Sequence, residues 1–311
     1  METSSANLAL VGHVSIPWHR RLFKALYVPM MLFPAVSIFL VLFVGALMMA
    51  LLQSFGYAPI YGINDFPTLR YYEEMINDYG FRISIVYTFY YALVPTIAGT
   101  IFSIYLALAL RKKFGQKTSF QFIYKLPLMI PYLVGVVLVI ELFTPGGMIA
   151  RMVAALGLID RPNEFPRILK TEWGWGVMMV YLWKQIPFTT LIVYSVLMGL
   201  GREYEEAAST LGANRRQTFW HITLPQIIPG IVAATLIVFP FNFNNFEVPY
   251  ILGADFPNSL PEQAWMTFDN ADYTKRLGAM AICMTLSVIC GFMLLLYLLF
   301  YRRYERKRGR Q

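Results

Sequence analysis

Six long apolar blocks alternate with polar connections along the chain. They cover roughly residues 25–52, 83–110, 121–144, 174–199, 228–251 and 278–301. Each block is long enough to cross a bilayer as an α-helix, which takes about 20 residues. The pattern therefore predicts an all-α, polytopic membrane protein with six transmembrane helices.

The overall composition agrees with this class. Hydrophobic residues make up 57% of the chain and charged residues only 14%, whereas soluble domains carry about 25% charged residues. A soluble protein with deeply buried helices could share this excess. It would have no need to gather the apolar residues into blocks of membrane-spanning length, so we favour the membrane class.

The connections between the blocks are too short for a soluble domain. The longest are residues 53–82, 145–173 and 252–277. They are aromatic and acidic, and we expect them to hold short interfacial helices or to dock a soluble partner. The predicted organisation is an N-terminal segment 1–24, a membrane domain 25–301 and a basic tail 302–311. No cleaved signal peptide is expected, so the first block should stay as an anchor.

Lysine and arginine residues are distributed unevenly between the two sides of the predicted membrane domain. Sixteen lie on the side that holds both chain ends, and eight lie on the other side. The side with the excess is expected to be cytoplasmic, so both termini should be cytoplasmic. The net charge of +8 is then explained by topology and contact with anionic lipid, and no nucleic-acid partner is predicted.

The sequence shows no signature of an enzyme or of a bound cofactor. No Gly-rich phosphate loop with its Lys and Ser/Thr occurs, so this chain is not expected to bind ATP in that way. His13, His19 and His221 lie outside the apolar blocks or at their edges, and no catalytic residues or metal ligands are predicted. Cys283 and Cys290 should lie about two turns apart on one helix face, too far apart to form a disulfide.

One polar stretch, residues 203–225 between the fourth and fifth blocks, contains more helix start and stop signals than a short connection needs. It begins with glutamates, which the helix dipole favours at an N-terminus, and Gly212 can end this first helix. Asn214 and Gln217 have the spacing of a capping box that opens a second helix. An apolar edge follows, and Pro225 is expected to close it. The stretch predicts a helix–turn–helix at the membrane surface.

Within this stretch, the sequence EAASTLGANRRQTFWHITLP resembles the EAA loop of permease subunits in binding-protein-dependent type I ABC importers. The family pattern is Glu-Ala-Ala, three residues, Gly, nine residues, Ile, one residue and Leu-Pro. The matching positions are Glu206, Ala207, Ala208, Gly212, Ile222, Leu224 and Pro225. The six-span topology is also similar to this family, over roughly residues 80–300.

The resemblance implies that residues 203–225 form a coupling helix in a groove of a dimeric cytoplasmic ABC ATPase, which would hold the ATP and Mg. It also implies a second permease subunit, expected as a different chain in a heterodimer. An extracytoplasmic solute-binding protein and a place in the bacterial inner membrane are implied as well. The alternative is an amphipathic helix that only rests on lipid.

Polar residues inside apolar spans are costly in hydrocarbon and are usually functional. The candidates for the translocation path are Glu141, Lys184, Asn242, Asn244, Asn245 and Glu247. The asparagines should face a water-filled path or another helix, and the flanking Pro240 and Pro249 can unwind their helix. Packing between helices is the alternative for the asparagines, and a mutual ion pair is the alternative for Glu141 and Lys184.

The transported solute is the property on which the sequence says least. Leu211-Gly212-Ala213 stands where sugar permeases often have Asp-Gly-Ala, and the chain looks more like polyamine, iron or thiamine permeases. Acidic Glu141 and Glu247 would suit a cation, so a polyamine is the first prediction and a sugar the alternative. A secondary transporter driven by ion gradients would need broken helices in two related halves, and only one such segment is found.

Overall fold

A computed structural model of the chain describes residues 18–111, 118–201 and 203–308. The start of the predicted N-terminal segment, the end of the basic tail, and Lys112, Lys113, Lys117 and Arg202 lie outside these described residues. Within them, regular structure is helical except for one pair of two-residue strands. The all-α prediction is confirmed, and six helices of the described part are long and apolar enough to cross a membrane.

The chain divides into two units, residues 1–52 and 53–311. The first unit contains most of α1 (Trp18–Ser54), whose apolar part, Pro29–Ser54, is 26 residues long. A span takes about 20 residues, so α1 by itself supplies the first predicted span.

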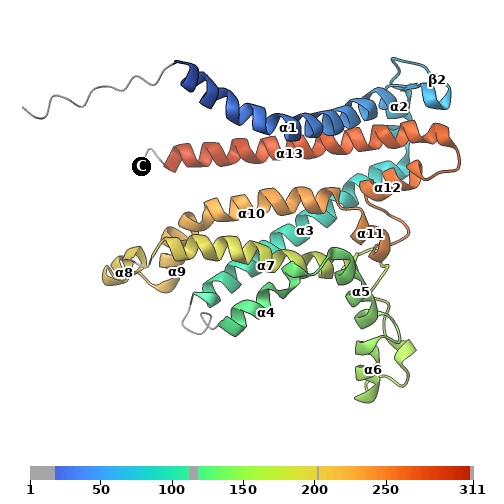
Figure 1. Ribbon diagram of the computed structural model, residues 1–311. Helices are drawn as coiled ribbons and strands as arrows, with labels where there is room; N and C mark the ends of the chain where they lie inside the picture. The colour runs from blue at the N-terminus through green and yellow to red at the C-terminus, as the bar shows by residue number, and fades with distance from the viewer. Residues whose placement is uncertain (1–17, 112–117, 202, 309–311) are drawn as a thin grey trace, which may run out of the picture. The chain divides into compact units, whose positions relative to one another are not determined.

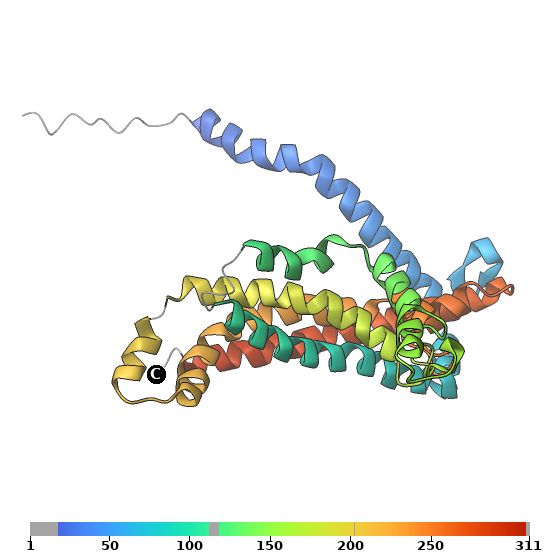
Figure 2. The same cartoon turned by 90° about the horizontal axis from the view of Figure 1, so that it is seen from below.

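The second unit is a bundle of long helices around α7. Its members are α3 (Tyr79–Leu110), α4 (Thr118–Met129), α5 (Tyr132–Phe143), α7 (Trp175–Gly199), α10 (Leu224–Asn244) and α13 (Arg276–Arg308). α3 and α10 pack against α7 and against each other, as Figures 1 and 2 show from two directions. α7 is central because buried residues recur along its whole length, from Gly176 to Leu197.

Short elements cover the two ends of this bundle (Figure 1). Beside the start of α3 and α7 lie β1 (Tyr57–Ala58), η1 (Pro59–Tyr61), β2 (Ile63–Asn64), α2 (Arg70–Asn77), α6 (Met148–Ala155), η3 (Pro162–Glu164), α11 (Glu247–Leu252), α12 (Leu260–Phe268) and η5 (Tyr273–Lys275). The two strands pair antiparallel. At the opposite end lie α8 (Glu203–Thr210) and α9 (Arg215–Thr218). The short helices predicted in the long connections are therefore present as α2, α6 and α12.

Two of the predicted spans are wrong as single helices. The third, 121–144, is divided at Pro131 into α4 and α5. The fifth, 228–251, is divided at Asn245 into α10 and α11. Apolar content continues across both breaks, so the hydropathy pattern cannot reveal them. Pro131 lacks an N–H, and the residue before a proline is disfavoured in the α conformation, which explains the first break.

A buried polar network joins α3, α7 and α10 at the middle of the bundle. Gln185 donates its side-chain amide to the carbonyl of Pro95. Asn242 donates to Gln185 Oε1 at 3.0 Å and to Thr96 Oγ1 at 3.3 Å. These bonds satisfy groups that would otherwise be unpaired at membrane depth. Gly99 makes the close approach possible, because a Cβ there would overlap the Gln185 side chain.

Replacing Gly99 with alanine should lower the thermal stability of the purified protein in detergent. The added Cβ would lie 2.9 Å from Gln185 Cδ and Cγ, and moving Gln185 would break its bonds to α3 and α10. Overpacking of this kind costs about 1–3 kcal/mol. The matched control is Gly291→Ala in α13, where no neighbour lies within 4 Å of the new Cβ and where alanine is the better helix former. Equal melting temperatures for the two variants would contradict the packing role of Gly99.

Candidate functional site

The predicted helix–turn–helix is present between α7 and α10. α8 ends in a Schellman motif: Gly212 N–H bonds to Ser209 O at 3.0 Å, and Ala213 N–H bonds to Ala208 O at 3.0 Å. Gly212 has φ +83°, a left-handed conformation that glycine adopts without the cost of a Cβ. The prediction that Gly212 ends the first helix is confirmed.

The second helix begins with the predicted capping box. Asn214 Oδ1 accepts from Gln217 N at 2.9 Å, and Gln217 Oε1 accepts from Asn214 N at 2.9 Å. These two bonds satisfy N–H groups that a helix start leaves without partners.

The prediction that Pro225 closes the second helix is wrong. After α9 the chain continues through a π-helical turn, η4 (Phe219–Thr223), directly into α10, and Pro225 lies in the first turn of α10. Leu224 N–H bonds to Phe219 O, five residues back. The wider turn changes the hydrogen-bond register just before a residue that has no N–H, so the proline is accommodated within a continuous helix. The loop is therefore continuous with the fifth span.

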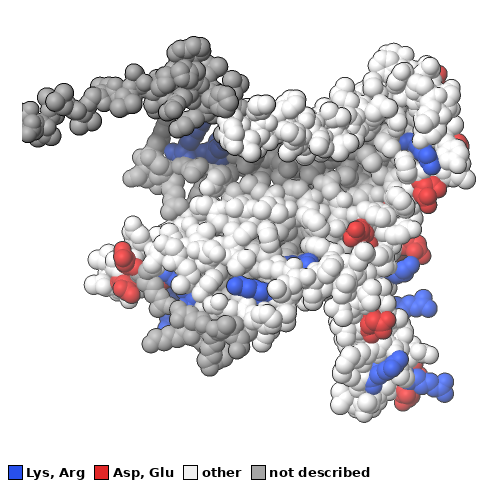
Figure 3. All heavy atoms as spheres, in the orientation of Figure 1, with Lys and Arg blue, Asp and Glu red and all other residues white. Residues whose placement is uncertain are grey.

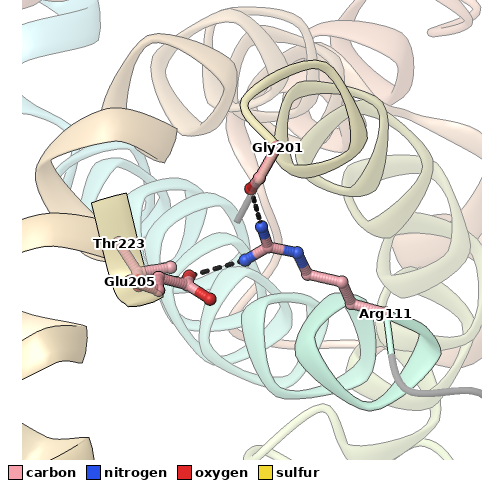
Figure 4. Close-up of polar contacts among 4 residues, drawn as sticks. All are labelled: Arg111, Gly201, Glu205 and Thr223. Carbon is pink, nitrogen blue, oxygen red and sulfur yellow. Dashed lines mark hydrogen bonds and ion pairs between the residues drawn. The ribbon is translucent and has the colours of Figure 1, made fainter. Parts of the chain in front are cut away.

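One ion pair fixes α8 to the bundle (Figure 4). Arg111, directly after α3, donates Nη1 to Glu205 Oε1 at 2.6 Å and Nη2 to the carbonyl of Gly201. Thr223 Oγ1 in η4 donates to the same Glu205 oxygen at 2.8 Å. The Arg111 side chain is 9% exposed and that of Glu205 is 29% exposed. The sequence alone gave no reason to pair these two residues. Arg111 is one of the basic residues on the predicted cytoplasmic side, and Glu205 is one of the glutamates at the start of the first helix.

Several large side chains of the loop are exposed. Tyr204 is 62% exposed, Leu211 89% and Trp220 55%. Glu206 is exposed as well, and the red acidic atoms of α8 stand at this end of the molecule in Figure 3. We call these four exposed residues, Tyr204, Glu206, Leu211 and Trp220, the loop face. Exposed aromatic and apolar side chains are typical of surfaces that contact a protein partner.

The remaining motif positions are divided between surface and interior. Ala207 and Gly212 are exposed, whereas Ala208 is the buried residue of α8. Ile222, Leu224 and Pro225 are half-buried where the loop joins α10. Behind the loop lies a cleft of about 670 Å³, lined by residues that include Arg111, Glu205, Glu206, Arg215 and Phe219.

The three asparagines of the fifth span are each hydrogen-bonded to other groups of the protein. Asn242 belongs to the buried network with Gln185. Asn244 donates to Pro240 O at 2.9 Å and to Cys290 Sγ at 3.3 Å. Asn245 Oδ1 accepts from Val248 N at 3.0 Å, which caps the start of α11. Glu247, in the first turn of α11, is exposed.

The helix break in this region falls at Asn245, between the two prolines that the sequence offered as its cause. Pro240 lies inside α10, and Pro249 lies in the first turn of α11. A continuous helix would need a bond from residue 249 to the carbonyl of Asn245, and Pro249 has no N–H to donate.

The alternative of an ion pair between Glu141 and Lys184 is wrong for the described residues. Lys184 instead donates Nζ to Pro127 O at 2.7 Å and to Ile130 O at 2.5 Å, and it lies 4.8 Å from the centre of the Tyr132 ring. Glu141 is exposed on α5. Pro127 O would normally accept from the N–H of residue 131, which is a proline. Lys184 therefore supplies the donor that the break between α4 and α5 removes.

The structure brings only some of the predicted path residues together. Lys184 and Asn242 line a cleft of about 230 Å³ beside Gln185 and aromatic residues of three helices, Tyr132, Phe188 and Phe241. Glu141, Asn244, Asn245 and Glu247 do not belong to this lining. The sequence did not identify Gln185 as a candidate path residue, because a single uncharged amide in an apolar block belongs to no motif.

These features define a polytopic α-helical membrane protein with an ordered helix–turn–helix between its fourth and fifth spans. The sequence model of the family described as "Binding-protein-dependent transport system inner membrane component" matches residues 99–308, a range that includes the whole loop. The chain belongs to this family, the permease subunits of type I ABC importers, and the resemblance seen in the loop is confirmed.

Known relatives agree with this assignment. The sulfate transport system permease protein CysT of Escherichia coli (strain K12) is 30% identical over 185 residues, which cover 58% of this chain and 63% of CysT. The chain thus spans less than two thirds of that relative. The inner membrane ABC transporter permease protein YdcU of the same organism is 28% identical over 307 residues, 92% of this chain and 91% of YdcU.

A solved structure has the same fold. It is the crystal structure of a bacterial ABC transporter involved in the import of the acidic polysaccharide alginate. The TM-score is 0.75 at 21% sequence identity, and the match covers 92% of this chain and 98% of that chain. At this level of identity the likeness concerns the fold.

Proposed function

We propose that this chain forms half of the translocation path of an ATP-driven importer and couples to a cytoplasmic ATPase through the α8–α9 loop. The observation that carries the proposal is the complete EAA spacing folded into a capped helix–turn–helix, with an exposed loop face and a partly buried ion pair that joins α8 to α3. The chain itself is a non-enzymatic subunit, and ATP and Mg bind to the partner ATPase dimer.

The proposed assembly contains two further partners. A second, different permease subunit completes the path, and an extracytoplasmic solute-binding protein delivers the solute, as the family description suggests. The complex lies in the bacterial inner membrane with both termini cytoplasmic. The excess of Lys and Arg on one side supports this orientation, and Arg111 of that side contacts the loop at the same end of the bundle.

The residues that line the cleft in the bundle support a proposal for the charge of the solute. The polyamine prediction used Glu141 and Glu247, but both carboxylates lie outside the lining of the cleft that holds Lys184 and Asn242. Lys184 is the basic residue of that lining, and its ammonium would repel a polyamine. The cleft therefore favours an anionic or uncharged polar solute. Among the solutes in the relatives' names, sulfate and the acidic polysaccharide alginate are anions, and the permease MsmF of Streptococcus mutans belongs to a multiple sugar-binding system.

Uptake by the reconstituted complex tests both parts of the proposal. The chain would be co-expressed with an ATPase, a second permease and a binding protein sought among the neighbouring genes, and purified into proteoliposomes. We expect an anion such as sulfate or an acidic oligosaccharide to stimulate ATP hydrolysis, and putrescine to have no effect. Stimulation by putrescine alone would restore the polyamine assignment. Absence of any bound ATPase would reject the coupling role.

A further inference from the structure

α8 is held to the rest of the molecule by few contacts. Ala208 is its one buried residue among those described. The helix lies between two glycines in the left-handed conformation, Gly201 at φ +66° and Gly212 at φ +83°. In the part of the chain that the structure describes, no atom lies within 4 Å of the place of a Cβ at either glycine. A short helix between two such positions, with little buried surface, would change its orientation easily.

The Arg111–Glu205 pair restrains α8 at the point where three helices meet. Arg111 follows α3, the carbonyl of Gly201 follows α7, and Thr223 lies in the turn that leads into α10 (Figure 4). The guanidinium lies at the C-terminal end of α7, and Glu205 lies in the first turn of α8, so both charges also match the helix dipoles. A guanidinium with two bonds at fixed angles holds its partners more rigidly than a single contact would.

We propose that the Arg111–Glu205 pair transmits movement between the loop face and the bundle, so that α8, α3 and the start of α10 move together. Both are positioning residues, since neither belongs to the loop face. The inference rests on the proposed docking of an ATPase to that face. Without the pair the ATPase should still bind, but α8 should turn about its two glycines instead of moving α3 and α10.

The test uses the assembled complex and neutral variants of nearly the same shape. Glu205→Gln keeps an acceptor for Thr223 but removes the charge, and Arg111→Gln removes the guanidinium. Glu203→Gln is the matched control, because it removes an exposed carboxylate from the same turn of α8. Co-purified ATPase, basal ATP hydrolysis, hydrolysis stimulated by the loaded binding protein, and uptake are measured on each preparation.

We expect Glu205→Gln and Arg111→Gln to retain the ATPase and its basal hydrolysis while reducing uptake per ATP about tenfold. The double variant should be no worse than the worse single variant, because both remove one interaction. Glu203→Gln should behave as wild type. Normal uptake per ATP in the single variants, or losses that multiply in the double variant, would overturn the inference.

Two further measurements keep the result decisive. Arg111→Lys keeps the positive charge but loses the paired N–H donors of the guanidinium. It replaces Arg111→Gln if that variant does not assemble.

Spin labels at positions 105 and 210, both exposed, report the α3–α8 distance in a chain with Cys283 and Cys290 replaced by alanine. Glu205→Gln should broaden this distance distribution, and an unchanged distribution would overturn the inference. A wild-type complex that binds no ATPase would reject the proposed function instead. Loss of the ATPase from all Arg111 and Glu205 variants, with the ATPase retained by Glu203→Gln, would make the pair part of the docking site. That result would also overturn the inference.

Discussion

Replacing Gly212 with aspartate should abolish solute uptake while the six spans still insert into the membrane. Gly212 has φ +83°, so any side chain adds about 1 kcal/mol or more of backbone strain to the Schellman turn. Among the described residues, no atom lies within 4 Å of a Cβ placed there. The space is therefore open to a partner, and a carboxylate beside the loop face would prevent close contact. Uptake, co-purified ATPase and stimulated ATP hydrolysis measure the effect.

Gly157 offers a control with the same local geometry. It follows α6, has φ +72° and open space around it, and ends its helix in the same motif, with Gly157 N bonded to Ala154 O and Leu158 N to Val153 O. Gly157→Asp should therefore have the same backbone strain without touching the loop. If both variants lose uptake equally, strain alone explains the loss; if Gly212→Asp transports normally, the loop is not a site of coupling.

Replacing Lys184 with methionine should destabilise the bundle strongly and alter the cleft. Methionine keeps much of the side-chain volume but cannot donate to Pro127 O and Ile130 O. Two carbonyls would lose their donor at membrane depth, at a combined cost of about 2–5 kcal/mol. The melting temperature in detergent should fall, and protease sensitivity should increase near residue 131, where α4 and α5 separate.

Lys125→Met serves as the control for charge. Lys125 also lies on the third span, in α4, where the structure gives it a contact with the Tyr124 ring at 5.7 Å. Its replacement should change stability much less. Equal melting temperatures for the two variants would mean that Lys184 is not needed at the break, and that its role is confined to the charge of the cleft.

The features that could be predicted from the sequence all depend on residues close together along the chain. Six spans could be predicted because a run of apolar residues suits lipid wherever it lies in the fold. The Schellman turn at Gly212 and the capping box at Asn214 could be predicted because both involve residues within five positions of each other. The loop could also be recognised because its motif is contiguous.

The failures concern residues that meet only in three dimensions. Lys184 bonds to carbonyls 54 and 57 residues away, and Arg111 pairs with a carboxylate 94 residues away. The sequence offered Glu141 as the partner of Lys184 because both are charged, whereas the actual acceptor was created by the missing N–H of Pro131. Pro225 was predicted to end a helix because a π-helical turn cannot be seen in the residue pattern.

The sequence by itself determined that the chain has six membrane-spanning segments and a capped helix–turn–helix between the fourth and fifth, since hydropathy and turn chemistry depend on neighbouring residues. Only the tertiary structure decided which polar groups satisfy each other inside the bundle and which remain at the cleft. The physical reason is that an unpaired polar group in hydrocarbon is costly, so each one takes the nearest partner that helix packing provides, whatever its distance along the chain.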